Sequence, residues 1–277
     1  MKYLDLTSYI PSQFPSYITD FEKLEELHLY FGSKWKLNKT GASLYIAMGM
    51  EDEIKTELNY HWLYNDTTRT VPTEIDNLKN LRVLNLSGDL KNLPLSMQKL
   101  TNLEELQLAG NFFSEKSNLF SAFKNVKKVH SLDLSYNLFS VLPSEIENFV
   151  SLKKLELDEN RFPTLPKSIG NLKNLIELHL SDNLIAELPT SIGNITQLES
   201  LNLSNNKLIK LPKSIAKLQN LKILNLYNNQ LTTLPKNIKK LNKQGVSISL
   251  GRNNFSDKEK KKIKKWLSNC SLSFEEY

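Results

Sequence analysis

A block of 23 residues recurs along this chain and leaves few architectures open to it. Four copies run in register, beginning at Ser151, Asn174, Gln197 and Asn220. Each contains L-x-x-L-x-L-x-x-N-x-L, with Phe162 or Ile185 in place of the last leucine in the first two copies, and then an outer segment of the form LPxxI. Self-similarity at a fixed period of this length is typical of a solenoid, in which each repeat packs only against its neighbours.

The apolar pattern predicts one short strand in each repeat. In L-x-L both leucines point to one face of an extended strand, and a single strand cannot bury them. Stacked strands would bury them in a parallel sheet. The middle leucine of the motif, or its equivalent, occurs at Leu4, Leu27, Leu84, Leu106, Leu132, Leu155, Leu178, Leu201, Leu224 and Ile248.

Two further positions recur outside the predicted strand. An asparagine follows it, and its amide can satisfy backbone groups where the chain leaves the sheet. The sequence therefore predicts a structural ladder of Asn111, Asn137, Asn160, Asn183, Asn206, Asn229 and Asn253. The outer segment carries Leu-Pro, and proline belongs outside a sheet, where it opens a short helical turn.

These motifs resemble the leucine-rich repeat family over residues 1–29 and 71–255. The LPxxIxxL outer segment is similar to the 23-residue class of bacterial proteins, including those of spirochaetes, and to that of Ras-binding and plant intracellular relatives. The resemblance implies an α/β solenoid. We expect a curved horseshoe with a parallel concave sheet of about ten strands and short helical or turn segments on the convex face.

The repeat leaves two irregular regions. We expect a solenoid over residues 1–255, with an insertion at about 32–70, and a helical cap over residues 256–277. Alternating apolar residues in the insertion predict a β-hairpin or meander, with a helix over 51–63 as the alternative. Its aromatic residues are either a secondary binding patch or packing over the first repeats. The secondary binding candidates are Trp35 and Trp62 in the insertion, with Tyr30 and Phe31 at the end of the preceding repeat.

The cap begins at Ser256 and Asp257, which can serve a helix N-terminus. Ile263, Trp266 and Leu267 share one stripe that would cover the last repeat. The segment Asp257–Lys265 holds six lysines and two acids, +4 of the net charge of +6. The lysines are interpreted as a solvated helix face, with a membrane or nucleic-acid role as the alternative.

Polar residues between the strand leucines should project from the concave face. Acidic residues of three consecutive repeats gather at its centre, which favours a basic patch on a protein partner and disfavours nucleic acid. The alternative is that these positions are polar only for solubility. The candidate partner-binding residues are Asp133, Tyr136, Glu156, Asp158, Glu159, Glu177, His179, Asp182 and Tyr227.

Enzymatic interpretations are weaker. Asp133, Glu156 and His179 are adjacent on one ladder, but an open surface with strands about 4.8 Å apart offers no closed metal shell. Cys270 is the single cysteine, and we interpret it as a cap residue rather than a nucleophile. The sequence has no phosphate-binding glycine loop and no HExxH, so we predict a non-enzymatic protein without catalytic residues, metal or cofactor.

The opening segment MKYLDLTSYIPS has no apolar signal-peptide core, and no apolar stretch approaches the ~20 residues of a membrane span. With one cysteine and no internal disulfide, this favours the cytoplasm, with export as the alternative. We expect a monomer, with pairing through exposed end strands as the alternative. The family resemblance implies recognition of a partner protein, in a bacterial host interaction. The alternative is an intracellular scaffold for a signalling GTPase or phosphatase.

Overall fold

The computed structural model describes residues 2–6, 21, 23–30, 71–88, 90–243 and 245–275. The chain divides into two compact units, Met1–Leu132 and Asp133–Tyr277. The predicted hairpin, meander or helix of the insertion lies outside the described residues. So do Phe31, Trp35, Trp62 and the side chain of Tyr30.

The first unit carries parallel strands that follow one another in chain order. Leu4, Leu27, Leu84 and Leu106 pair successively in register, so their side chains form one buried column. The strands are β1 (Tyr3–Leu6), β2 (Glu26–Tyr30), β3 (Val83–Ser87) and β4 (Glu105–Gln107). Strand β5 (Ser131–Asp133) spans the boundary between the units.

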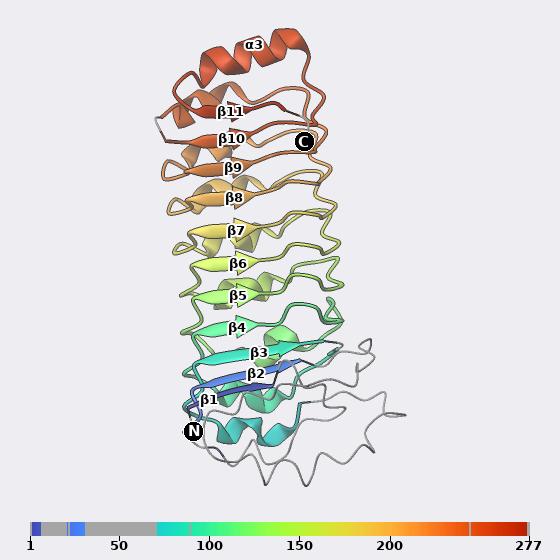
Figure 1. Ribbon diagram of the computed structural model, residues 1–277, viewed down its shortest axis with the longest axis vertical. Coiled ribbons are helices and arrows are strands. Elements are labelled where there is room, and N and C mark those ends of the chain that lie inside the picture. The colour runs from blue at the N-terminus through green and yellow to red at the C-terminus, as the bar shows by residue number, and fades with distance from the viewer. Residues whose placement is uncertain are drawn as a thin grey trace, which may run out of the picture. The chain divides into compact units, whose positions relative to one another are not determined.

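The second unit repeats the same arrangement (Figure 1). Leu155, Leu178, Leu201 and Leu224 are fully buried and pair in register. Its strands are β6 (Lys154–Glu156), β7 (Glu177–His179), β8 (Ser200–Asn202), β9 (Ile223–Asn225), β10 (Ser247–Ser249) and β11 (Ser271–Ser273). Strands and outer turns thus form the α/β solenoid that the repeat predicts.

The outer segments are 3₁₀ turns, and a proline precedes each of them. One isoleucine or methionine in each turn is fully buried, as Ile169 and Ile192 illustrate. The turns are η2 (Thr73–Asn77), η3 (Leu95–Lys99), η4 (Ser144–Asn148), η5 (Lys167–Asn171), η6 (Thr190–Asn194), η7 (Lys213–Lys217) and η8 (Lys236–Leu241). A short α-helix, α2 (Leu119–Ala122), stands in the longer repeat that follows β4.

The C-terminal segment holds the predicted helix and one additional strand that the sequence does not predict. Helix α3 (Asp257–Trp266) begins after Ser256, whose side chain accepts a hydrogen bond from the Glu259 amide. Ile263 and Leu267 are fully buried. The chain then returns as β11, which pairs in parallel with β10 (Figure 1). The Ser-Leu-Ser of β11 lacks the L-x-L signature, so the repeat pattern could not predict it.

The asparagine side chains link neighbouring repeats where the strands end. Asn183 Nδ2 donates to the carbonyls of Leu157 (2.9 Å) and Leu180 (3.2 Å), and its Oδ1 accepts from the Phe162 amide (3.1 Å). Asn160, Asn206 and Asn229 make the equivalent contacts. The same geometry recurs at Asn111 and Asn253, and Asn137 donates to the carbonyls of Leu134 and Ser135.

No helix within the described ranges is long and apolar enough to cross a bilayer.

Candidate functional site

The register of the second unit brings the predicted acidic residues onto neighbouring strands. Lys154 of β6 lies opposite Glu177 of β7, and Glu156 lies opposite His179. We call Asp133, Glu156, Asp158, Glu159, Glu177 and Asp182 the acidic strip. All six belong to the second unit. Adjacent strands lie about 4.8 Å apart, so a bound surface can contact several of these carboxylates together.

Lys154 is the cation within this group. Its ammonium lies 3.1 Å from Glu156 Oε2. Partial burial opposes the charged form. The hydrogen bond and charge of Glu156, together with the charges of Glu177 and Asp133, nevertheless raise the pKa of Lys154. Three carboxylates therefore act on one ammonium, and the strip remains net negative.

Two of the six carboxylates also shape the backbone. Asp133 Oδ1 accepts from the Ser135 amide at 2.8 Å. Asp158 Oδ1 accepts from the amide and hydroxyl of Ser181 in the next repeat. Asn202 and Asn225 accept from the amide two residues ahead in the same way as Asp133, so a neutral residue can fill that position. Asp133 and Asp158 therefore have a structural role that sequence reasoning missed.

The residue before each ladder asparagine adopts a left-handed conformation. Tyr136, Glu159 and Asp182 have φ values of 55°, 53° and 56°. The corresponding positions in other repeats are Gly88, Gly110, Asn205, Asn228 and Arg252. We call these positions the left-handed column. Five of their backbone amides, from Tyr136 to Asn228, donate to the next repeat, as from Glu159 to the Ser181 carbonyl at 3.0 Å. Glycine and asparagine tolerate this conformation best, so Tyr136 and Glu159 occupy it at a cost.

The aromatic candidates differ in their surroundings. Tyr136 is 63% exposed and stands beside the acidic residues in the column. Tyr227 instead lies under the Arg252 guanidinium, with its ring centroid 5.6 Å away. Ile223 of β9, which sequence reasoning did not select, is 51% exposed between serines of the neighbouring strands. Its only sequence signal is an apolar residue at a position that is otherwise mostly polar.

His179 is half-buried, and its Nε2 lies 3.7 Å from Glu177 Oε2. Within the described parts of the chain, no three His, Cys, Asp or Glu side chains are grouped so that they could hold a metal ion. Cys270 is half-buried, with its Sγ 3.3 Å from the Leu241 carbonyl. Burial raises the pKa of the Cys270 thiol, although a hydrogen bond with the Lys243 backbone opposes the change.

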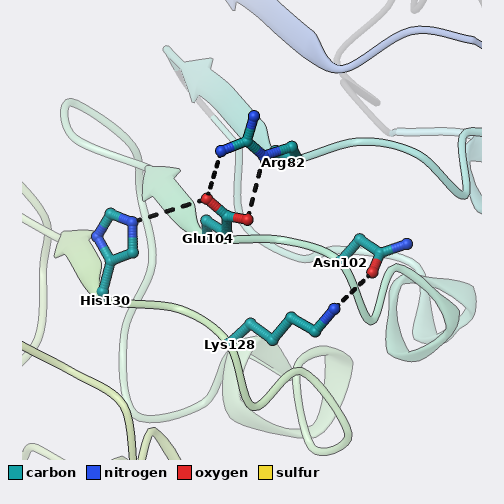
Figure 2. Close-up of polar contacts among 5 residues, drawn as sticks. All are labelled: Arg82, Asn102, Glu104, Lys128 and His130. Carbon is teal, nitrogen blue, oxygen red and sulfur yellow. Dashed lines mark hydrogen bonds and ion pairs between the residues drawn. The ribbon is translucent and has the colours of Figure 1, made fainter.

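A second polar feature, in the first unit, was missed by sequence reasoning. We call Lys2, Glu25, Arg82, Glu104 and His130 the charged row. Arg82 donates to both oxygens of Glu104, at 3.1 and 2.8 Å, and His130 Nε2 lies 3.9 Å from the same carboxylate (Figure 2). Lys2 approaches Glu25 at 2.7 Å. The available signal was alternating charge at the residue that follows the first apolar position of each of these repeats.

The charged row borders a pocket of 490 Å³. Lys23, Asn80 and Asn102 complete its lining, and Lys128 donates to Asn102 Oδ1 at 2.8 Å (Figure 2). Hydrogen bonds from Lys2 and Arg82 lower the pKa values of Glu25 and Glu104, respectively, while partial burial opposes both shifts. Because its cations and carboxylates pair with each other, the charged row is a weaker binding candidate than the acidic strip.

Comparisons with known proteins agree with this geometry. A family model described as a leucine-rich repeat region matches residues 106–206. A second, described as leucine rich repeat, matches residues 197–218 and 220–241. A comparison with curated proteins gave no match.

Solved structures share the fold at low identity. The leucine-rich repeat ectodomain of the Arabidopsis thaliana receptor kinase GASSHO1/SCHENGEN3 is 20% identical, with a TM-score of 0.66 over 99% of this chain and 29% of that one. An internalin (inlF) from Listeria monocytogenes is 21% identical, with a TM-score of 0.65 over 96% of this chain and 72% of that one.

The Arabidopsis receptor kinase HAESA is 29% identical, with a TM-score of 0.56 over 68% of this chain. This chain spans only 29% and 33% of the two receptor chains. The repeat pattern and the parallel strands agree with both family models, which identify leucine-rich repeats within residues 106–241.

Proposed function

We propose that this chain is a non-enzymatic protein-binding module and that the acidic strip, with Tyr136 beside it, binds a partner protein through a basic surface. The acidic strip remains net negative although Glu156 pairs with Lys154, and negative charge on a broad open sheet favours association with the opposite charge. An open surface without an enclosed reaction site suits recognition better than catalysis. The proposed partner is a folded protein or a peptide with clustered Lys and Arg.

The left-handed column gives the strongest support, because its residues differ between repeats. In the first unit this position is occupied by Gly88 and Gly110. In two repeats of the second unit it is occupied by Asn205 and Asn228. Tyr136 and Glu159 replace these easier residues beside the acidic strip, and the Tyr136 ring is largely exposed. Backbone strain carried by an exposed side chain is typical of binding positions, because packing does not explain its presence.

The solved relatives support the class of partner. GASSHO1/SCHENGEN3 was solved in complex with CASPARIAN STRIP INTEGRITY FACTOR 2, and HAESA with the peptide hormone IDA and the co-receptor SERK1. These ligands belong to those proteins. They support the proposal that a repeat surface of this kind binds proteins or peptides.

The class of repeat also suggests a biological setting. The LPxxIxxL outer segments are similar to the bacterial 23-residue class, and an internalin from Listeria monocytogenes shares the fold. We favour a bacterial protein that recognises a host protein. An intracellular scaffold for a signalling GTPase or phosphatase is the second candidate. Recovery of the native protein outside intact cells would argue against the scaffold.

The test compares three proteins in affinity capture followed by mass spectrometry. The first is the wild type. The second is Glu156→Gln/Glu159→Asn/Glu177→Gln, which removes three charges and spares the backbone contacts of Asp133 and Asp158. The third is a control, Glu145→Gln/Glu147→Gln/Glu187→Gln, which removes the same charge elsewhere in the second unit. Circular dichroism checks that all three fold.

We expect a partner that the wild type and the control retain and the strip variant loses, with weaker capture at high salt. A partner retained equally by all three proteins would refute binding at the acidic strip. A partner lost equally from both variants would show that only total charge matters.

A further inference from the structure

The second unit is strongly polarised in charge. Residues 133–206 contain five Lys and Arg against ten Asp and Glu, a net charge of −5. Residues 207–275 contain sixteen Lys and Arg against three Asp and Glu, a net charge of +13. The excess is thus much larger than the +4 of the helix segment alone, and it extends over several repeats.

The structure gathers these lysines onto adjoining elements. Turn η7 packs against η8, and Lys243, which follows η8, donates to the Gln219 carbonyl at 2.9 Å. Lys239 of η8 and Lys262 of α3 both lie over the Trp266 ring, 5.1 and 4.4 Å from its centroid. We call this surface the basic end: Lys213, Lys217, Lys236, Lys239, Lys240, Lys243, Lys258, Lys260, Lys261, Lys262, Lys264 and Lys265.

Little negative charge opposes the basic end. Glu259 is 8% exposed and pairs with Lys262 at 3.0 Å. Asp257 is exposed in the first turn of α3. Lys258, Lys261 and Lys265 project from the side of α3 opposite the buried Ile263, since residues two or five positions away on a helix point in nearly opposite directions.

We propose that the basic end docks on an anionic lipid surface as a peripheral, non-inserting contact. Clusters of four to eight lysines on an amphipathic helix are attracted to anionic headgroups. Ile263 and Leu267 are fully buried against the protein, so the apolar side of α3 is already occupied and the contact is electrostatic. Half-buried Trp266, between the lysines, suits the headgroup layer.

The same residues favour lipid over nucleic acid. Single-stranded nucleic acids bind to exposed aromatic faces. Here Lys262 lies over Trp266, and Lys264 lies 5.7 Å from the Phe274 ring centroid. Base recognition in a duplex uses Arg prominently, whereas fifteen of the sixteen cations in residues 207–275 are lysines. Lysine ammonium groups are strongly hydrated point charges, which suits diffuse contact with a headgroup layer.

The experiment is co-sedimentation of the full chain with vesicles. One set contains phosphatidylcholine alone, and the other contains phosphatidylcholine with phosphatidylserine. The test variant is Lys258→Gln/Lys261→Gln/Lys265→Gln. The matched control, Lys116→Gln/Lys124→Gln/Lys153→Gln, removes the same charge from exposed positions outside the basic end. All six positions are exposed, so both variants should fold, and thermal unfolding verifies this.

We expect binding only to the phosphatidylserine vesicles and release as salt is raised. The test variant should bind roughly 100-fold more weakly, which corresponds to about 1 kcal/mol for each of three lysines, while the control keeps nearly wild-type binding. Equal binding to both vesicle types, or equal loss in both variants, would overturn the proposal.

A random-sequence DNA duplex, measured by fluorescence anisotropy at the same salt, is the competing ligand. Tighter binding to the duplex than to phosphatidylserine vesicles, lost in the test variant, would make the basic end a nucleic-acid surface instead. Sedimentation velocity tests a second alternative. Salt-dependent dimers that the test variant does not form would mean that the basic end binds the acidic strip of a second copy of this chain. Either result would refute the lipid assignment.

Discussion

The Arg82 guanidinium and the Glu104 carboxylate join two successive repeats of the first unit through a two-point contact (Figure 2). The planar guanidinium matches the two carboxylate oxygens, so one geometry is favoured. Both residues stand one position after the first leucine of their repeats. Repeats with a 22-residue offset are therefore linked by charge as well as by buried leucines.

This contact predicts a pH-dependent contribution to stability. The hydrogen bond from Arg82, opposed by partial burial and assisted by the charges of Arg82, His130 and Lys128, lowers the pKa of Glu104. Its stabilising effect is therefore present above the pKa of the unfolded state and disappears as pH falls through the folded pKa. We expect Glu104→Gln to lower the melting temperature at neutral pH and to match the wild type in acid. Glu105→Gln is the control, and a pH-independent difference would contradict the assignment.

The left-handed column predicts a conflict between stability and binding at Glu159. Glu159→Asn should stabilise the protein by up to about 1 kcal/mol, because asparagine tolerates positive φ better. It should also weaken binding to a basic partner. Urea unfolding and partner titration measure the two effects, with Tyr136→Asn as a second test of the stability gain. If both substitutions destabilised the protein, the Glu159 and Tyr136 side chains would be stabilising the fold rather than straining it.

The asparagine ladder predicts a cost for removing one buried amide. Asn183→Ala would leave the amide of Phe162 and the carbonyl of Leu157 without their side-chain partner. We expect a loss of roughly 1–3 kcal/mol in the free energy of unfolding. Asn194→Ala, at an exposed position of η6, should change it little. Equal effects in urea unfolding would contradict a special role for the ladder.

Gly170 predicts a steric limit between outer turns. A Cβ atom at this position would lie 2.4 Å from the Ser191 carbonyl oxygen. Gly170→Ala should therefore destabilise the second unit by roughly 1–3 kcal/mol, as overpacking does elsewhere. Ala216→Gly, at the equivalent position two repeats later, relieves no such clash and is the control. If Gly170→Ala left the melting temperature unchanged, the turns would have to separate easily enough to accommodate the added Cβ atom.

Cys270 predicts low thiol reactivity in the folded protein. Burial raises the pKa of this thiol, and the thiolate is the reactive form. We expect slow alkylation by iodoacetamide at neutral pH and faster alkylation at alkaline pH or after unfolding in urea. Mass spectrometry gives a clean measurement because the chain has no other cysteine. Rapid modification of the folded protein at neutral pH would reveal an activated thiol.

The fold was more predictable than the candidate site. Leu155, Leu178 and Leu201 recur at one spacing, and their burial follows from alternation in any extended strand. The acidic strip was also visible, since strand register follows the repeat. The backbone roles of Asp133 and Asp158 were not visible, because their carboxylates could equally have pointed to solvent.

The C-terminal region shows the same division. Ser256 and the apolar stripe through Ile263 indicate a helix start and a buried face, and α3 has both. Strand β11 carries no repeat signature, and its place follows from pairing with β10. The lysines of η8 and α3 are far apart in sequence, and only folding brings Lys239 and Lys262 to one ring.

The repeat unit, its buried leucines and the polar positions available for binding could all be predicted from the amino-acid pattern, because they depend on local periodicity repeated at a constant interval. Which side chains pair became known from the folded chain: Arg82 with Glu104, Asp158 with Ser181, and Trp266 with two lysines. The folded chain also showed the left-handed column that includes Glu159. Such pairings depend on distances and side-chain directions between repeats, and a one-dimensional pattern does not contain them.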